Sequence, residues 1–410
     1  MSFQDFKLRN ELIKVLEELN YKIPTPIQED SIPKILEGKD LLGIAQTGTG
    51  KTAAFSLPIL DSFLNKKIKS KKQHPKALIL APTRELCAQI GENIKAYSKY
   101  TKIKTLVTYG GVSSEPQIKA LNEIQDILIA TPGRLVDLIE QKNVFLDEIE
   151  FLVLDEADNL IKMGLRVDLK KILKKLPKNK QNLFFSATMN KEIKSTANEL
   201  LIDPIKIEID IEEINLKLIE QNVFYVLKEH KIKTLLEILK KKEVRSALIF
   251  TNSKLTSDNI IRSLTKNNIK SEALHSGKSN THREKVIRHI KTKEIKYLVA
   301  TDLASRGLDF CDMTHVINFE IPKDFESYTH RIGRIGRAGK KGVAYSLCSL
   351  EERNFFKKIE EANKYPIKVI KHDYHSNLVK SNGGKKSIGT RYRPKVRRTS
   401  GGYNNRKKKK

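Results

Sequence analysis

The chain has 410 residues, of which 39% are hydrophobic and 31% charged, and its formal net charge is +28. This length fits two domains and a tail, at roughly 150 residues per domain, and no apolar run approaches the ~20 residues of a membrane-spanning helix. The first residues lack the pattern of a secretory signal peptide. Three distant cysteines, Cys87, Cys311 and Cys348, form no Cys-x-x-Cys pair, which argues against disulfide or zinc sites and favours a reducing cytoplasm.

Much of the positive charge lies at the C-terminal end. Residues 371–410 contain fourteen Lys or Arg and one acid, Asp373, so they carry +13 of the net charge. Such an excess indicates a polyanionic partner bound through phosphate neutralisation, most simply nucleic acid. A solubilising surplus is the alternative. Apolar periodicity fades from about residue 369 onward, so residues 369–410 are predicted to be a disordered basic tail.

The first predicted strand leads into a stretch with the pattern of a phosphate-binding loop. Apolar spacing predicts a helix between residues 8 and 19 and a strand at residues 41–44. Glycines in the next stretch let backbone N–H groups converge on phosphate oxygens at a helix N-terminus. Lys51 can then reach the β and γ phosphates, and Thr52 can hold Mg²⁺. The stretch is Ala45, Gln46, Thr47, Gly48, Thr49, Gly50, Lys51 and Thr52.

The strict phosphate-loop pattern begins with Gly where this chain has Ala45, so a Gly-Thr loop without a ligand is the alternative.

Further apolar runs at residues 77–81, 127–130, 151–154 and 183–185 each end in a polar cluster. Such runs, separated by helical stretches, indicate a parallel sheet covered on both faces, with ligands at its carboxyl edge.

Residues 205–211 alternate apolar with polar and predict a last strand, which places a first domain at residues 1–208 and a linker at residues 209–218. The same alternation of strands and helices restarts after the linker. Strands are predicted at residues 247–250, 297–300, 315–318 and 343–346, without a second phosphate loop. Residues 219–368 are therefore predicted to form a second α/β domain that cannot hold a nucleotide alone.

Two acids and three arginines complete the predicted nucleotide site. Asp155 can hold Mg²⁺, directly or through water, and Glu156 can orient or deprotonate the attacking water. Arg331, Arg334 and Arg337 lie among glycines in the second domain. They could stabilise a γ-phosphate in its transition state once the domains close, or bind a nucleic-acid backbone. A solvated basic loop is the alternative.

The run Asp155-Glu156-Ala157-Asp158, with the phosphate loop and arginine cluster, resembles the DEAD-box ATP-dependent RNA helicases over residues 3 to about 350. Within that family the chain looks like the bacterial RhlE-type enzymes. The resemblance implies two tandem RecA-like domains that bind ATP and Mg²⁺ between them and RNA across both. The implied activity is RNA-stimulated ATP hydrolysis coupled to local, sequence-independent separation of short duplexes, in a cytoplasmic and monomeric enzyme.

The resemblance also implies roles for individual residues. Tyr21 to Gln28 resembles the adenine-reading segment, in which Gln28 pairs with the adenine edge and Phe3 stacks on the ring; Asp309 would bind the ribose. The residues implied to couple the nucleotide and RNA sites are Asp158, Ser186, Thr188, His330 and Arg331. The implied RNA contacts are Pro82, Thr83, Arg84, Gly110, Gly111, Thr131, Arg134, Thr251, Gly277, Arg283, Thr301 and Arg306. Hydroxyls, glycine amides and arginines suit phosphate and sugar, and the 2′-OH would select RNA over DNA.

Four positions depart from the family pattern. Asn20 stands where Gly is usual, and Tyr21 stands where Phe is common. Asn280 replaces the usual Gln before Arg283, and Ile335 replaces a small or hydroxylic residue. Ribosome assembly or RNA decay is the implied setting, with ribosomal particles or RNA-decay proteins as partners. Two other functions stay open. A non-enzymatic RNA-binding or annealing protein would act without ATP, and a DNA helicase would be stimulated by DNA.

Overall fold

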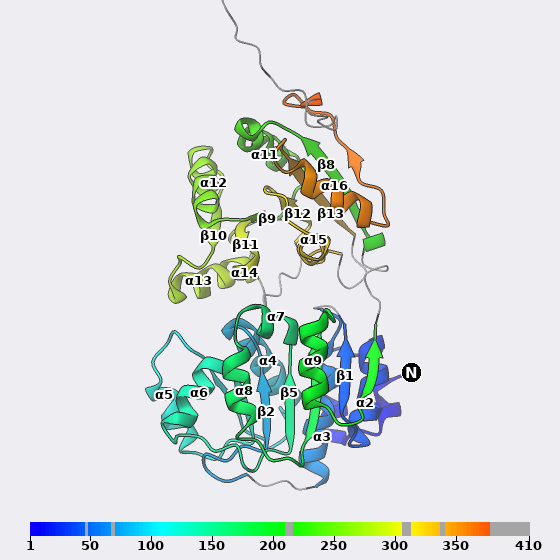
Figure 1. Ribbon diagram of the computed structural model, residues 1–410, viewed down its shortest axis with the longest axis vertical. Coiled ribbons are helices and arrows are strands. Elements are labelled where there is room, and N and C mark those ends of the chain that lie inside the picture. The colour runs from blue at the N-terminus through cyan, green and yellow to red at the C-terminus, as the bar shows by residue number, and fades with distance from the viewer. Residues whose placement is uncertain (46–47, 67–69, 210–215, 306–312, 337–340, 378–410) are drawn as a thin grey trace, which may run out of the picture.

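The computed structural model describes residues 1–45, 48–66, 70–209, 216–305, 313–336 and 341–377, which form two α/β domains (Figure 1). The elements of the first domain are η1 (Phe3–Phe6), α1 (Asn10–Glu18), α2 (Pro26–Leu36), β1 (Leu41–Ile44), α3 (Lys51–Asn65), β2 (Ala77–Leu80), α4 (Arg84–Tyr97), β3 (Thr105–Thr108), α5 (Glu115–Leu121), β4 (Ile127–Ala130), α6 (Pro132–Glu140), β5 (Phe151–Leu154), α7 (Ala157–Lys162), α8 (Arg166–Leu173), β6 (Gln181–Ser186), α9 (Lys191–Leu200) and β7 (Ile205–Glu208). Those of the second domain are β8 (Ile219–Tyr225), η2 (Lys228–His230), α11 (Lys231–Lys240), β9 (Ala247–Thr251), α12 (Lys254–Lys266), β10 (Ser271–Leu274), α13 (Asn280–Lys291), β11 (Tyr297–Thr301), α14 (Asp302–Ser305), β12 (His315–Asn318), α15 (Phe325–Ile332), β13 (Gly342–Cys348), α16 (Arg353–Ala362) and β14 (Lys368–Val369).

Each domain is built around a parallel sheet of seven strands. The first sheet has the order β3-β4-β2-β5-β6-β1-β7, and the second has the order β10-β11-β9-β12-β13-β8-β14. Counted from the first strand of each sheet, the two orders are the same, so the two domains share one topology. The predicted fold class, two tandem mostly parallel α/β domains, is confirmed.

The central strands are buried on both faces because helices pack on each side of the sheet. Neighbouring residues of β2 enter different cores: Ile79 packs in one hydrophobic cluster, whereas Leu78 and Leu80 pack in another. All four residues of β2, β4 and β5 are buried. This two-sided burial explains why these strands are continuous apolar runs in the sequence.

The carboxyl ends of the first sheet face the second domain (Figure 1). The phosphate loop follows β1, Asp155 follows β5, and Ser186 ends β6, so these predicted site residues share one edge of the sheet. In the second domain the equivalent junction, between β8 and α11, comprises residues 226–230 and contains no glycine. Only the first domain therefore has a glycine-rich loop at this position.

The second domain extends beyond its predicted end at residue 368. Strand β14 pairs with β8, and the N–H of Ser376 donates to the carbonyl of Tyr225 at 2.9 Å. The predicted tail boundary at residue 369 is therefore too early, because residues 368–376 pack on the second domain. In the predicted linker, Leu216 packs in the second core, whereas residues 210–215 and 378–410 lie outside the described residues. Among the described helices, none has the length and apolar character needed to cross a membrane.

Candidate functional site

The turn between β1 and α3 has the backbone conformation that its glycines allow. Gly48 has φ +88° and Gly50 has φ +97°, in the left-handed region that side chains disfavour. A Cβ on Gly50 would lie 2.4 Å from Nε2 of Gln28 and 2.8 Å from Oγ1 of Thr25. The position therefore accepts only glycine, and α3 begins at the next residue, Lys51. Gln46 and Thr47 lie outside the described residues.

Gln28 ties the first turn of α2 to this loop. Its Oε1 accepts from the N–H of Thr25 at 2.9 Å, and its Nε2 donates to the carbonyl of Gly50 at 3.1 Å. The first bond is part of a capping box, which satisfies free N–H groups at the start of the helix. Gln28 is thus buried against the phosphate loop. Nearby, Tyr21 is partly exposed, and its ring centroid lies 6.1 Å from that of Phe3, which is buried in the core.

Lys51 and Asp155 are two buried charged residues at the carboxyl edge of the sheet. Nζ of Lys51 donates to the carbonyl of Ala45 at 2.7 Å, and both side chains are nearly inaccessible to solvent. Burial raises the pKa of Asp155 to about 6, against the attraction of Lys51, and the nearby carboxylates of Glu156 and Asp158 raise it further. A carboxyl group with this pKa changes charge readily when a cation approaches.

Glu156 has a strained backbone at the N-terminus of α7. Its φ and ψ are both 49°, a left-handed conformation that costs a non-glycine residue on the order of 1 kcal/mol. The N–H of Glu156 donates to Oδ1 of Asp155 at 2.9 Å, and Nδ2 of Asn159 donates to Oε2 of Glu156 at 2.9 Å. The first bond orients the Asp155 carboxylate, and the second orients the Glu156 carboxylate.

Asp158 of α7 contacts the turn that follows β6. Its carboxylate accepts from the N–H of Ala187 at 3.4 Å and from Oγ1 of Thr188 at 3.5 Å. Oγ of Ser186 donates to the carbonyl of Thr188 at 2.7 Å, so Ser186 and Thr188 close a tight turn. The coupling residues predicted in the first domain therefore lie in contact with one another.

The contact between α7 and α15 joins the two domains. Lys162 of α7 forms an ion pair with Glu326 of α15 and lies 4.0 Å from Asp158. Burial lowers the pKa of His330, while the carboxylates of Asp158 and Glu326 oppose that shift. His330 is therefore close enough to Asp158 for the two groups to interact across the domain boundary.

Arg331 is an internal anchor of the second domain. Its guanidinium group forms a bidentate pair with Asp302, at 2.6 and 2.7 Å, and donates to the carbonyl of Glu320 at 2.6 Å and to Oδ1 of Asn252 at 2.8 Å. Only 1% of Arg331 is exposed. These partners follow β9, β11 and β12, so Arg331 ties three strand ends together.

The rest of the arginine cluster follows α15. Arg334 is buried, and Arg337 lies outside the described residues. Ile335 packs in the core of the second domain, where a Cβ on Gly342 would lie 2.8 Å from the Cβ of Ile335. The larger side chain that Ile335 brings to this position is therefore accommodated by apolar packing against Gly342.

The predicted RNA-contact residues of the first domain follow β2, β3 and β4 at one edge of the sheet. Thr83 caps α4 by accepting from the N–H of Leu86 at 3.3 Å, and Thr131 precedes α6. Nη2 of Arg134 donates to the carbonyl of Val112 at 2.9 Å. The residues in this group are Pro82, Thr83, Arg84, Gly110, Gly111, Thr131 and Arg134.

In the second domain the predicted RNA contacts differ in accessibility. Thr251 is fully buried, with its hydroxyl 2.6 Å from that of Ser257. Thr301 ends β11 and is partly exposed, and Gly277 follows β10. Arg306 and the predicted ribose ligand Asp309 lie outside the described residues.

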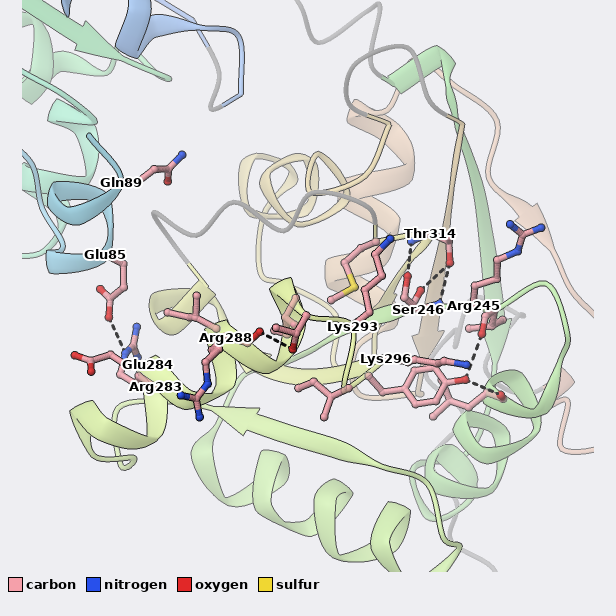
Figure 2. A pocket seen from close by; sticks show the side chains of 18 of the residues that line it. Glu85, Gln89, Arg245, Ser246, Arg283, Glu284, Arg288, Lys293, Lys296 and Thr314 are labelled. Carbon is pink, nitrogen blue, oxygen red and sulfur yellow. Dashed lines mark hydrogen bonds and ion pairs between the residues drawn. The ribbon is translucent and has the colours of Figure 1, made fainter. Parts of the chain in front are cut away.

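Glu85 lies within the run from Pro82 to Leu86 that is predicted to contact RNA, and it makes a contact that the sequence did not predict. Its Oε1 accepts from Nε of Arg84 and from Nε of Arg283, each at 2.8 Å, and Arg283 belongs to the second domain (Figure 2). Burial opposes ionisation of Glu85, yet the two guanidinium groups hold its pKa below the usual value. One carboxylate thus bridges two of the predicted RNA-binding arginines across the domain boundary.

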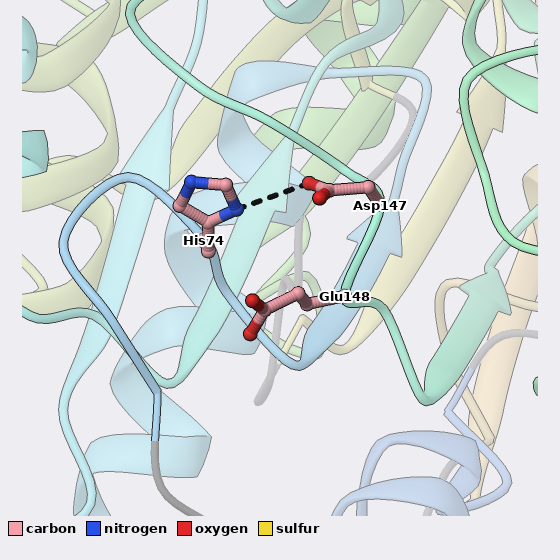
Figure 3. Close-up of side chains that lie close together, drawn as sticks. All are labelled: His74, Asp147 and Glu148. Atoms are coloured by element: carbon pink, nitrogen blue, oxygen red, sulfur yellow. Dashed lines mark hydrogen bonds and ion pairs between the residues drawn. The ribbon is translucent and has the colours of Figure 1, made fainter.

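A second group of acids lies away from this edge. His74, Asp147 and Glu148 come together near the amino ends of β2 and β5 (Figure 3). Glu148 pairs with Lys71 at 2.7 Å and with Lys76 at 3.1 Å, and these bonds lower its pKa to about 2. Because the lysines already balance its charge, Glu148 has no need of a metal ion.

Two family models match the chain. The model described as DEAD/DEAH box helicase matches residues 25–196, and the model described as Helicase conserved C-terminal domain matches residues 230–339. The first contains the phosphate loop, Asp155 and Glu156, and the second contains Arg283, Arg331 and Arg334. The two matched segments fall within the two α/β domains.

Known proteins are similar over most of the chain. The DEAD-box ATP-dependent RNA helicase CshA of Bacillus cereus is 39% identical, over 88% of this chain and 68% of the relative. The ATP-dependent RNA helicase CshA of Listeria monocytogenes is 40% identical, over 88% of this chain and 69% of the relative. Among solved structures, S. cerevisiae Dbp5 bound to RNA and ADP BeF3 has a TM-score of 0.80 at 29% identity, covering 90% of this chain and 95% of that chain. A DEAD box protein from the hyperthermophile Methanococcus jannaschii has a TM-score of 0.53 at 36% identity, covering 90% and 99%. The chain belongs to the DEAD-box ATP-dependent RNA helicase family.

Proposed function

We propose that this chain hydrolyses ATP in response to RNA and uses the cycle to separate short RNA duplexes locally. The observation that carries the proposal is the carboxyl edge of the first sheet, where a glycine-dependent phosphate loop, Lys51 and the pair Asp155–Glu156 face the arginine-bearing second domain. The similarity to Dbp5 bound to RNA and ADP BeF3 supports the same reading of the two-domain arrangement.

The residues at the loop fit a magnesium nucleotide. The left-handed glycines leave room for phosphate next to backbone N–H groups, and α3 directs its N-terminus at the same point. Thr52 and Asp155 are the proposed Mg²⁺ ligands, either directly or through water; the ion would supply positive charge at the phosphate oxygens. Gln28, Tyr21 and Phe3 are proposed to bind the adenine, and Asp309 the ribose.

In the proposed hydrolysis, Glu156 orients a water molecule and accepts its proton as the water oxygen bonds to the γ phosphorus. The bond from that phosphorus to the β–γ bridging oxygen breaks, which leaves ADP and inorganic phosphate. Lys51 neutralises charge on the phosphates, and Arg334 and Arg337 stabilise the charge of the transition state when the domains close. Asp158, Ser186, Thr188 and His330 couple this closure to RNA.

RNA is proposed to lie across both domains, held mainly by phosphate and sugar. The N-cap hydroxyls, glycine amides and arginines at the strand ends suit such contacts, which makes binding largely independent of sequence. Bending one strand on this surface would release the other. The RhlE-type branch, the monomeric state, the cytoplasmic location and a role in ribosome assembly or RNA decay belong to this proposal as predictions.

The function is tested by measuring ATP hydrolysis with single-stranded RNA, with DNA of the same sequence and with neither, alongside displacement of a short RNA duplex. We expect RNA to stimulate hydrolysis more than DNA, duplex separation to require ATP, and Lys51→Ala to abolish both activities. Strand annealing that needs no ATP and survives Lys51→Ala would identify the non-enzymatic alternative. Equal stimulation by DNA would favour the DNA helicase.

The raised pKa of Asp155 predicts a pH dependence for Mg²⁺-dependent nucleotide binding. The ionised carboxylate is the proposed ligand, so ATP affinity at limiting Mg²⁺ should rise from pH 5 to pH 7, through the pKa of about 6. Because this folded-state pKa exceeds the ordinary 3.8, protonation of Asp155 stabilises the fold below pH 3.8, and that contribution is lost as the pH rises through 6. Titration calorimetry of wild type and Asp155→Asn measures the effect. If the ATP affinity of Asp155→Asn rose between pH 5 and pH 7 as it does in wild type, Asp155 would not be the titrating Mg²⁺ ligand.

Glu85→Gln should steepen the salt dependence of RNA binding. The carboxylate now holds Arg84 and Arg283, so its removal makes a guanidinium group available to phosphate. The slope of log affinity against log salt should then become steeper by about 0.7 per added contact. Glu199→Gln is the matched control, because it makes the same charge change at an exposed position near the C-terminal end of α9 without freeing an arginine. Identical slopes for Glu85→Gln and wild type would contradict the RNA role of these arginines.

A further inference from the structure

A large cavity lies between the two domains, beside the contact of Glu85 with Arg283 (Figure 2). Its volume is about 1460 Å³. The first domain contributes one face of α4 and Tyr109. The second contributes α13, the loop between α11 and β9, and the residues just before β11 and β12. The cavity thus runs from the predicted RNA contacts Arg84 and Arg283 to a part of the second domain to which no role was assigned.

The lining of this cavity is strongly basic. It contains nine lysines and arginines and three glutamates, of which Glu85 is already paired with two arginines. Four of the cations, Arg245, Arg288, Lys293 and Lys296, are exposed, and none of them forms an ion pair with a residue that the structure describes. Figure 2 shows them spread from the Arg283 end of the cavity toward Thr314. Unpaired cations lining one cavity favour a polyanionic occupant.

Apolar side chains lie between these cations. Ile287 and Ile290 of α13, together with Met313 and Tyr297, are only partly buried and line the same cavity. The hydroxyl of Tyr297 is held by the carbonyls of Leu239 and Val244, at 3.3 and 3.2 Å, so its ring is fixed in place. A basic groove with apolar and aromatic surface suits single-stranded nucleic acid, whose phosphates meet the cations while its bases lie on the apolar side chains.

We propose that this cavity is a second RNA-binding segment, which holds RNA that continues beyond the nucleotides bound at the strand ends. Arg288, Lys293 and Lys296 contact its phosphates, and Ile287, Ile290 and Tyr297 contact its bases. The inference rests on the proposed function. RNA is favoured over an acidic protein segment because the cavity begins at Arg84 and Arg283 and is continuous with them. Since both domains line it, RNA bound here also favours the closed arrangement.

The test compares two RNA lengths on the full chain, in the presence of a non-hydrolysable ATP analogue. Both are uridine RNAs. The shorter has about 6 nucleotides, near the lower limit of common single-strand site sizes, and the longer has about 20 nucleotides, above their upper limit. The variant Arg288→Ala/Lys293→Ala/Lys296→Ala should bind the longer RNA about 10-fold more weakly, with a salt slope flatter by about 2, as expected for three lost phosphate contacts. Its affinity for the shorter RNA, and ATP hydrolysis stimulated by that RNA, should match wild type.

The matched control is Arg262→Ala/Lys266→Ala/Lys270→Ala, which removes one arginine and two lysines from exposed positions outside the cavity. It should leave both affinities close to wild type. The inference would be overturned if the cavity variant bound the longer RNA as tightly as wild type does. It would also be overturned if the cavity variant and the control variant lost the same affinity for both RNAs. The cavity would instead be a protein-docking site if a poly-glutamate peptide bound wild type but not the cavity variant, while the cavity variant still bound the longer RNA. If neither RNA stimulates ATP hydrolysis by wild type, the proposed function fails, and this inference fails with it.

Discussion

Glu156→Gln is expected to lower the kcat of RNA-stimulated ATP hydrolysis by a factor of about 10²–10⁴, the usual contribution of a positioned general base. The amide keeps the size of the side chain, and its oxygen can still accept from Nδ2 of Asn159. It cannot accept a proton from the attacking water. The backbone strain at this residue is unchanged, so the fold and the position of α7 should be retained.

Steady-state hydrolysis at saturating RNA measures the effect, and binding of ATP and RNA should stay within a few-fold of wild type. Glu150→Gln is the control: it makes the same change at the opposite end of β5, where the side chain is 41% exposed. That variant should be fully active. If Glu156→Gln kept more than half of the wild-type turnover, Glu156 would not be the base, and another group would have to activate the water.

The fold was predictable where strands are buried on both faces. β2, β4 and β5 are continuous apolar runs because helices cover both sides of the sheet. The strands without a prediction have weaker patterns. β3 and β10 lie at sheet edges and are partly exposed, and β8 contains the polar run Glu220, Gln221 and Asn222. A two-residue strand such as β14 has no pattern of its own, which explains why the second domain ends later than predicted.

The location of the site was predictable because parallel strands end at a common edge. The contacts between the residues of the site were not predictable, because they depend on pairing between segments that are distant in the sequence. Glu85 and Arg283 are 198 residues apart in sequence, and no local spacing indicates that they meet. Arg331 belongs to a motif that suggests anion binding, yet its five donors are directed at groups of its own domain. Thr251 shares a pattern with exposed hydroxyls but bonds inward to Ser257.

The central claim is that a nucleotide held by the first domain is completed by arginines from the second. Replacing Arg334 and Arg337 together with alanine should lower the kcat of RNA-stimulated hydrolysis by on the order of 10³-fold, at the lower end of the range for arginine fingers. ATP affinity should stay close to wild type, because the phosphate loop, Lys51 and Asp155 all belong to the first domain. Arg262→Ala, on the exposed face of α12, serves as the charge control.

The decisive measurement is single-turnover ATP hydrolysis by this double variant, with ATP and RNA both saturating. A loss of about three orders of magnitude, with nucleotide binding intact, is the result that closure of the two domains predicts. Wild-type turnover in the double variant would contradict it, because the first domain would then complete the chemistry without the second.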